Sequence, residues 1–276
     1  MTPTPTGAQP VLALDRIGVE WPGATPGAPA YLAVAEVSLA VRAGEFVSVV
    51  GPTGCGKSTL LNIAAGLLAP TSGTVLVGGE PLSGINRRAG YLFQSDALMP
   101  WRNARENVEA GLIFAGADRA EARDRAEQWL RRVGLGGFGD RYPHELSGGM
   151  RKRVGLAQVL ILQPHILLMD EPFGALDVQT RQLMENELLD LWSAERRSVV
   201  FITHDLEEAI ALSDRIVLLS AAPATRPIGE FSIDLPRPRD VAEIRLTPRF
   251  LELHGRIWAA LRSEVLKAYA VSQRLA

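Results

Sequence analysis

The 276-residue chain contains a single cysteine, Cys55. One cysteine excludes an internal disulfide bond and a zinc site built from cysteines. The chain also lacks any apolar stretch near the roughly 18 residues that a membrane-spanning helix needs. Its opening, MTPTPTGAQP, has neither the basic nor the apolar region of a signal peptide. We therefore expect a soluble protein of a reducing cytoplasm that reaches a membrane only through a partner.

The chain lacks an excess of charge of either sign, because 29 Lys and Arg residues balance 31 Asp and Glu residues. Proteins that grip nucleic acid mainly by electrostatics carry a marked basic excess, so we expect no nucleic-acid partner. Apolar side chains, by contrast, make up 47% of the chain, which is ample for a packed core.

Four short apolar runs predict buried strands. They are rich in Val, Ile and Leu without clean alternation, as parallel strands covered on both faces are. The runs are FVSVV (46–50), ILLM (166–169), VVFIT (199–203) and RIVLL (215–219). Helical patterns lie between them, at 57–68, 178–195 and 206–212. Strands that alternate with helices predict an α/β domain with a largely parallel sheet.

Three other segments differ from this alternation. From about Ser95 to Gln163 the patterns are helical and no strand is indicated, so we interpret this stretch as an inserted helical subdomain. Apolar residues at helical spacing over 246–270 predict a last helix, packed on its own domain. The first ten residues and the segment 21–30 are rich in Pro, Thr or Gly and predict irregular chain.

The segment GPTGCGKS, Gly51–Ser58, matches the phosphate-loop pattern G-x-x-x-x-G-K-[ST] in full, between a predicted strand and a predicted helix. Its glycines allow backbone amides to turn towards phosphate oxygens, and Lys57 adds a positive charge. The Ser58 hydroxyl can bind Mg²⁺. A glycine-rich turn without a ligand is the alternative, but the lysine, the hydroxyl and both flanks favour a phosphate site.

Polar residues follow other predicted strands, at the edge where open α/β sheets bind ligands. Asp170 and Glu171 close ILLMDE, and His204 closes VVFIT. Asp170 can hold Mg²⁺ through water, Glu171 can polarise an attacking water, and His204 can reach a terminal phosphate. Gln94 follows GYLF and could bind Mg²⁺ or that water, although a plain polar strand end is equally consistent with the pattern.

The segment LSGGMRKR, 146–153, looks by itself like the start of a second helix whose open amides could hold a phosphate. The segment is one of six motifs that occur in the order found in ATP-binding cassette transporter ATPases. The other five are the phosphate loop, Gln94, LLMDEP, ALD (175–177) and His204. From about residue 12 to 219 the chain resembles that family. Several segments are most similar to bacterial importer ATPases for nitrate, sulfonate and taurine: FQSDALMPWRNARENV, HELSGGMRKRVGLA, MDEPFGALDVQTR, FITHDLEEAIALSDRIVLLS and IDLPRPRD (233–240).

The resemblance implies a P-loop NTPase (RecA-like) α/β core with a mostly parallel sheet, an N-terminal antiparallel β part and an inserted α-helical signature subdomain. We expect a nucleotide-binding domain over 1–235, with the helical subdomain at about 95–163. A C-terminal helical extension over 236–276 is expected to pack on it. Met150, Lys152 and Thr53 depart from the commonest family residues without removing a catalytic group, so an active ATPase is expected.

The resemblance also implies ATP and Mg²⁺ as cofactors, held between two copies of the chain arranged head to tail. Glu171 is then the general base, His204 the switch histidine, and Ser58, Gln94 and Asp170 the metal-side residues. Trp21 is the candidate for stacking on adenine, with Tyr31 as the alternative. The remaining implied nucleotide contacts come from the loop and, for the partner's ATP, from the signature and the 175–177 loop: Gly51, Pro52, Thr53, Gly54, Cys55, Gly56, Lys57, Ser58, Thr59; Ser147, Gly148, Gly149, Asp177.

In the family, membrane permease subunits contact the region equivalent to Met99–Trp101, although burial within the helical subdomain is an alternative use of these residues. The resemblance therefore implies a peripheral protein on the cytoplasmic face of the membrane, linked indirectly to an extracytoplasmic solute-binding protein. A soluble cassette ATPase of DNA repair or translation is a rival, but such proteins usually carry coiled-coil, zinc or tandem-cassette insertions. An unrelated P-loop enzyme would leave LSGGM and His204 as coincidences.

Overall fold

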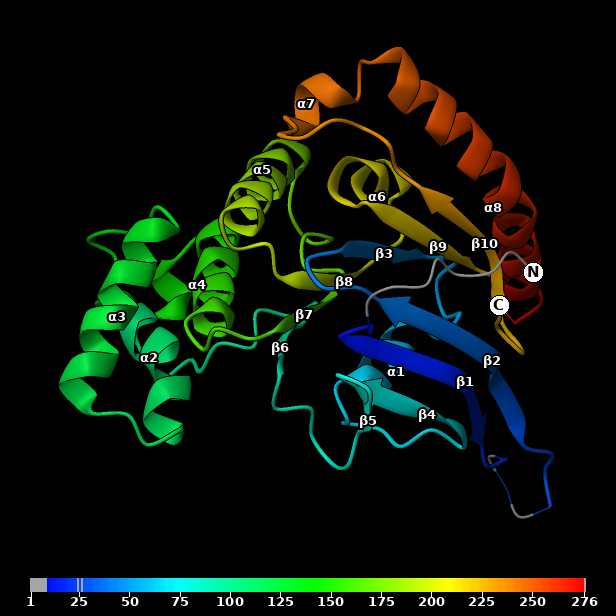
Figure 1. The fold of residues 1–276 in the computed structure, drawn as a ribbon, viewed down its shortest axis with the longest axis horizontal. Helices are drawn as coiled ribbons and strands as arrows, with labels where there is room; N and C mark the ends of the chain where they lie inside the picture. Colours follow the sequence, from blue (N-terminus) through cyan, green and yellow to red (C-terminus); the bar gives the residue numbers. More distant parts are fainter. Residues whose placement is uncertain (1–8, 24, 26, 276) are drawn as a thin grey trace.

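The computed structural model describes residues 9–23, 25 and 27–275, so the predicted irregular start lies almost wholly outside the described residues. Near the N-terminus lies a four-stranded antiparallel sheet with the order β2-β1-β4-β5 (Figure 1). This confirms the expected antiparallel part. Its strands are β1 (Leu12–Trp21), β2 (Tyr31–Val41), β4 (Ser72–Val77) and β5 (Glu80–Pro81).

The second sheet contains six strands in the order β10-β9-β3-β8-β7-β6. All neighbours are parallel except the β10–β9 pair. The four predicted apolar runs are its adjacent central strands β9, β3, β8 and β7, which confirms the parallel α/β core. The bounds are β3 (Phe46–Val50), β6 (Ala89–Leu92), β7 (Ile166–Asp170), β8 (Ser198–Thr203), β9 (Arg215–Leu219) and β10 (Pro227–Ser232).

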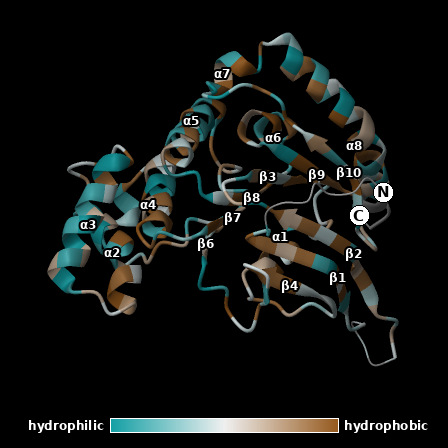
Figure 2. Cartoon of the chain, viewed as in Figure 1, coloured by the Kyte–Doolittle hydropathy of each residue, from teal (hydrophilic) through white to brown (hydrophobic). Residues whose placement is uncertain are grey.

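Both faces of this central sheet are covered, which explains why its strands do not alternate with polar residues. Alternate residues of β3 enter different cores: Val47 and Val49 pack towards α1 (Lys57–Ala64) and the antiparallel sheet, whereas Phe46 and Val50 pack on the helical side. Figure 2 shows hydrophobic residues concentrated along these central strands. The sheet is thus a rigid platform whose carboxyl edge can hold a site.

Two of the three predicted helices between the strands have the predicted bounds, α5 (Val178–Glu195) and α6 (Leu206–Leu212). The prediction 57–68 is wrong at its end, because α1 stops at Ala64. Gly66 there takes a left-handed φ of 72°, and a Cβ would come within 2.0 Å of the Gly84 carbonyl oxygen. Gly66 follows the C-cap, and the Leu67 amide donates to the Asn62 carbonyl oxygen at 2.9 Å, so a glycine cap ends the helix. The glycine of AAGLL is a local signal for this end that the prediction did not use.

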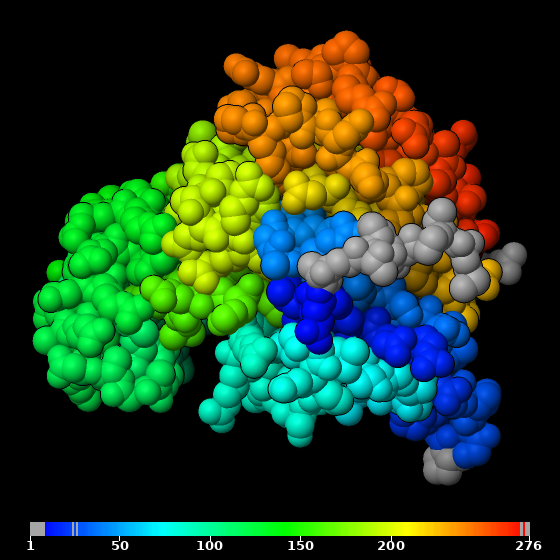
Figure 3. Space-filling view, in the orientation of Figure 1, coloured from blue at the N-terminus to red at the C-terminus, as the bar shows by residue number. Residues whose placement is uncertain are grey.

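Residues 95–163 form helices and no strand, as predicted. They comprise α2 (Ala104–Phe114), α3 (Arg119–Arg132), a short 3₁₀ turn η1 (Pro143–Glu145) and α4 (Gly148–Leu160). Buried Val108, Ala122, Ala126, Leu130 and Val154 pack these helices together. Figure 3 shows this green part projecting from the body of the molecule. The signature segment therefore lies on a unit of its own, at the start of α4.

The predicted tail helix is confirmed as α8 (Pro248–Leu275), which begins after Thr247 and runs beyond residue 270. Its buried stripe of Phe250, Leu253, Ile257 and Leu261 joins the helical-side core. A short helix that the pattern did not indicate, α7 (Val241–Ile244), precedes it and is capped by Asp240. No helix in the described part of the chain is both long and apolar enough to cross a bilayer.

Candidate functional site

The phosphate loop joins the end of β3 to the start of α1. Gly54 and Gly56 take left-handed φ values of 78° and 95°, which side chains rarely adopt. Gly56 is the N-cap of α1 and makes no side-chain cap, so the first amides of the helix are available to an anion. Gly51 is closely packed, since a Cβ there would lie 3.1 Å from the Leu219 carbonyl oxygen.

The Lys57 side chain is curled back into this loop and is only 5% exposed. Its ammonium donates hydrogen bonds to the carbonyl oxygens of Gly51, at 2.9 Å, and Pro52, at 3.1 Å. The same nitrogen lies 3.9 Å from Glu171 Oε1. The loop therefore holds a buried positive charge next to the carboxylate of Glu171.

Ser58 and Asp170, predicted as metal-side residues, meet directly across the site. The Ser58 hydroxyl donates to Asp170 Oδ1 at 2.9 Å. Burial raises the pKa of Asp170, and this hydrogen bond opposes the rise. Two oxygen ligands with one negative charge fit Mg²⁺, which proteins hold with one or two carboxylates while phosphates and water complete the shell. The described residues contain no cluster of three or more His, Cys, Asp or Glu side chains that could cage a metal by themselves.

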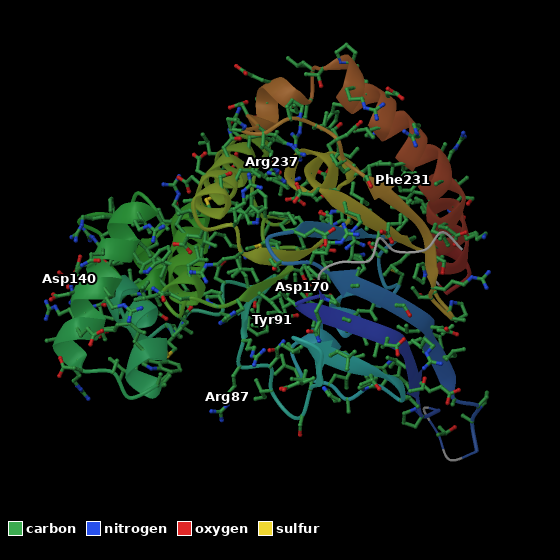
Figure 4. The ribbon with its side chains drawn as sticks, viewed as in Figure 1. Arg87, Tyr91, Asp140, Asp170, Phe231 and Arg237 are labelled. Carbon is green, nitrogen blue, oxygen red and sulfur yellow. The ribbon has the colours of Figure 1, made fainter. Side chains whose placement is uncertain are left out.

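Tyr91 is a site neighbour that the sequence reasoning missed. Its hydroxyl donates to Asn62 Oδ1 at 3.0 Å and lies 3.5 Å from Asp170 Oδ2 (Figure 4). Burial, and next the charge of Asp170, raise the pKa of Tyr91, so it stays a protonated donor. The signal was present in GYLF, the apolar run before Gln94, but the parallel pairing of β6 with β7 is needed to bring Tyr91 to Asp170.

Glu171 and His204 face each other at the carboxyl edge of β7 and β8. Glu171 takes a positive φ of 42°, and its amide donates to the Ile202 carbonyl oxygen at 2.9 Å. The carboxylate Oε2 lies 2.9 Å from Nδ1 of the exposed His204 ring. The strained backbone thus turns the second acid out of the strand towards the histidine.

Lys57, Ser58, Glu171 and His204 line one cavity of about 360 Å³, whereas Asp170 and Tyr91 are not part of its lining. The structure brings Gln94, Glu171 and His204 there, although their strands are far apart in sequence. The other lining residues all belong to the loop or the start of α1: Thr53, Gly54, Gly56, Lys57, Ser58 and Thr59. Pro52 and Cys55 are buried behind the loop, and burial raises the pKa of the Cys55 thiol.

The signature residues do not line this cavity. Ser147 is the exposed N-cap of α4 and accepts from the Met150 amide at 3.3 Å. Gly149 lies against α5, where a Cβ would come within 2.8 Å of Thr180 Cγ2. Asp177 is the exposed N-cap of α5, and the hydrogen bond from the Thr180 amide lowers its pKa. Neither these residues nor Gly148 are among those that line the cavity.

The two candidates for adenine stacking lie opposite each other on neighbouring antiparallel strands, since Trp21 of β1 pairs in register with Tyr31 of β2. Both rings are exposed, and neither lines the cavity. The sheet does reach the loop, because a Cβ at Gly56 would meet Val34 of β2 at 3.2 Å. Register therefore places both aromatics at one end of the same hairpin and leaves both as candidates.

Comparisons with known proteins identify the family of the chain. A family model described as ABC transporter matches residues 34–174. The chain is 43% identical over 256 residues to a taurine import ATP-binding protein of Mesorhizobium japonicum, covering 91% of this chain and 97% of that one. It is 42% identical over 236 residues to a nitrate import ATP-binding protein of Synechocystis sp., covering 84% and 88%.

Among solved structures, the chain resembles a dimeric ATP-binding cassette in a post-hydrolysis state, bound to ADP and Pi. The TM-score is 0.71 at 32% identity, over 82% of this chain and 100% of that one. An intact phosphate loop, the paired acids after β7 and these matches point the same way. The chain belongs to the ABC transporter family and is an ATPase, a nucleotide-binding subunit of that family.

Proposed function

We propose that this ATPase drives a bacterial importer as a head-to-tail pair of identical chains. The observation that carries the proposal is the separation of two surfaces: a cavity with loop, acids and histidine, and an exposed signature start that the cavity does not use. Each cavity is complete only when the Ser147–Gly149 surface of a second copy covers it. The dimeric cassette among the structural neighbours supports this arrangement.

The catalytic residues act mainly by positioning and charge. Lys57 and the amides at the start of α1 hold the β- and γ-phosphates, while Ser58 and Asp170 hold Mg²⁺, with Gln94 at the same cavity. When bound, Mg²⁺ neutralises charge that develops on the transferred phosphoryl group. Glu171 accepts a hydrogen bond from the attacking water and serves as general base.

His204 keeps the Glu171 carboxylate in place through the 2.9 Å contact and reaches the terminal phosphate with its other ring nitrogen. The partner's signature amides and Ser147 hydroxyl bind that phosphate only while it is attached to ATP. Hydrolysis therefore removes the bridge between the two chains and favours the open state. Asp177 contacts the partner beside this bridge.

The permease subunits are proposed to dock on the helical subdomain. A groove of about 280 Å³ there is lined by Phe93, Met99, Phe114 and Leu162, among others. Trp101, two residues after Met99 in the chain, is 72% exposed. Exposed aromatic and methionine side chains at a groove suit an apolar helix of a partner. The protein is then peripheral on the cytoplasmic face, and an extracytoplasmic binding protein supplies a taurine- or nitrate-type small solute.

The decisive experiment is Glu171→Gln, compared with Glu80→Gln, which alters an exposed acid on β5. The first variant should bind ATP, accumulate as a dimer with ATP and Mg²⁺, and lose turnover, because the amide cannot accept the proton of water. The second should behave as the wild type in gel filtration and phosphate release. Hydrolysis at the wild-type rate by Glu171→Gln would refute the assigned base.

A further inference from the structure

Arg181, in the first turn of α5, joins two loops of the site that are distant in sequence. Its Nη2 donates to the Leu176 carbonyl oxygen at 3.1 Å, and its Nη1 donates to Asp205 Oδ2 at 3.3 Å. Leu176 is the middle residue of the 175–177 loop, and Asp205 follows His204 directly. One guanidinium therefore connects the loop proposed to face the partner with the loop that carries the histidine.

Asp205 is itself held by several hydrogen bonds. Its Oδ1 caps α6 by accepting from the amides of Glu207, at 2.9 Å, and Glu208, at 3.2 Å. Its own amide donates to Thr203 Oγ1 at 2.9 Å. One carboxylate oxygen thus accepts from the first amides of α6 and the other accepts from Arg181. The carboxylate therefore links Arg181 to the segment that carries His204. The His204 ring in turn contacts Glu171.

Two further acidic side chains lie near the guanidinium, Glu185 and Glu208, and both are buried. Burial raises the pKa of each carboxyl. Arg245, which follows α7, pairs with Glu185 at 3.2 Å and lies 3.8 Å from Glu207. The Arg181–Asp205 pair itself is half-buried, and a hydrogen bond between two charged groups is shorter and stronger than one between neutral groups.

We propose that Arg181 is a positioning residue that carries the state of the 175–177 loop to His204 and Glu171 of the same chain. The inference rests on the proposed function, because it needs a partner chain to contact that loop. When the partner contacts the 175–177 loop, a shift of the Leu176 carbonyl is passed through the guanidinium to Asp205, and from there to His204 and to the Glu171 carboxylate that it contacts.

Arginine is required because the two acceptors lie in different directions. A planar guanidinium satisfies both at once, whereas a lysine ammonium behaves as a single point charge. Arg181→Lys therefore retains an ion pair with Asp205 but loses the bridge. This variant separates a positioning role from a purely structural one.

The experiment compares Arg181→Lys, Arg181→Met, Asp205→Asn and the double variant Arg181→Met/Asp205→Asn. Asn keeps the cap of α6 and removes the charge. Arg132→Met is the matched control, because Arg132 pairs with Glu195 at the opposite end of α5. ATPase kinetics, thermal unfolding and ATP-dependent dimerisation in a Glu171→Gln background are measured for each.

We expect Arg181→Lys to unfold and dimerise as the wild type does, with a KM for ATP unchanged within about twofold and kcat reduced roughly tenfold or more. Arg181→Met and Asp205→Asn should lower kcat comparably, with little further loss in the double variant, because they break one connection. The chain has only 4 histidines, so the His204 ring can be followed by NMR; its signal should shift in Arg181→Lys and not in Arg132→Met.

Wild-type kcat in Arg181→Lys, additive losses in the double variant, or failure of the Arg181 variants to dimerise would each overturn the inference. A different result bears on the proposed function instead. If the wild type shows no ATPase activity, or if Glu171→Gln alone never dimerises with ATP, the two-chain mechanism fails before Arg181 is considered.

Discussion

The ammonium of Lys152, on the signature helix α4, donates a hydrogen bond to the Gln94 carbonyl oxygen at 2.6 Å. Lys152 is 4% exposed and also pairs with Asp96 at 3.2 Å, while Arg151 binds the other Asp96 oxygen at 2.7 Å. Two of the three basic residues of LSGGMRKR therefore point back to the loop after β6, while the third, Arg153, pairs with Glu187 of α5 at 2.7 Å. Gln94 is hydrogen-bonded to α4 through Lys152, and Ser147 is the N-cap of the same helix, so we expect the two residues to move together.

Substitution of Lys152 tests this tie. Lys152→Met leaves the Gln94 carbonyl oxygen without its buried donor and should lower the free energy of unfolding by about 1–3 kcal/mol. It should also reduce kcat, because Gln94 loses its anchor at the cavity. Lys152→Gln keeps a hydrogen-bond donor and should retain most of the unfolding free energy and most of kcat. Urea unfolding measures the first quantity and ATPase assays measure the second. Equal behaviour of the two variants would show that the hydrogen bond is unimportant.

Ser147→Arg should abolish hydrolysis while leaving ATP binding to the isolated chain largely intact. A long cationic side chain at the exposed N-cap blocks the approach of the second copy and costs about 1 kcal/mol of capping. Ser147→Ala removes both the cap and the hydroxyl proposed to bind the partner's phosphate but adds no bulk, so it is the comparison variant, measured by gel filtration with ATP and by phosphate release. Gly149→Asp is a poorer test, because its Cβ also meets Thr180. Normal turnover by Ser147→Arg would contradict the head-to-tail site.

Asp170→Asn should uncouple Mg²⁺ from the nucleotide. The Ser58 hydroxyl can still donate to the amide oxygen, so the fold is retained, but the charge that attracts the cation is lost. We expect titration calorimetry to show that the variant binds ATP without Mg²⁺ about as well as the wild type does. Adding Mg²⁺ should increase this affinity little, and kcat should be at least about tenfold lower. An undiminished Mg²⁺ effect would place the metal on other residues.

Glu208 gives a pH prediction. Burial, the largest cause, raises its pKa from 4.5 to about 8; the charges of Glu185 and Asp205 add to the rise, and Arg181 opposes it. A carboxyl whose folded pKa is raised contributes stability that is full below 4.5 and is lost as the pH rises through about 8. The unfolding free energy of the wild type should thus fall between these pH limits, and Glu208→Gln should remove this part of the fall. Relative to its value at low pH, the variant should lose roughly 1–3 kcal/mol less than the wild type at pH 8.5. A variant with the same pH dependence as the wild type would refute this.

The sequence by itself determined the elements that depend on neighbouring residues. The phosphate loop with its flanks, the apolar runs of β3, β7, β8 and β9, and the helical stretch 95–163 all follow from local pattern. Hydrophobic periodicity and glycine placement act over a few residues, so a single chain suffices to predict them. The order of the motifs then indicated one family, which the comparisons confirmed.

Only the tertiary structure decided what distant segments do to one another. The approach of Tyr91 to Asp170 depends on the β6–β7 pairing, and the direction of Lys152 depends on the loop at Gln94. Trp21 and Tyr31 became neighbours through strand register. Each is a contact between residues far apart in sequence, set by packing of whole elements, and packing leaves no local pattern in the chain.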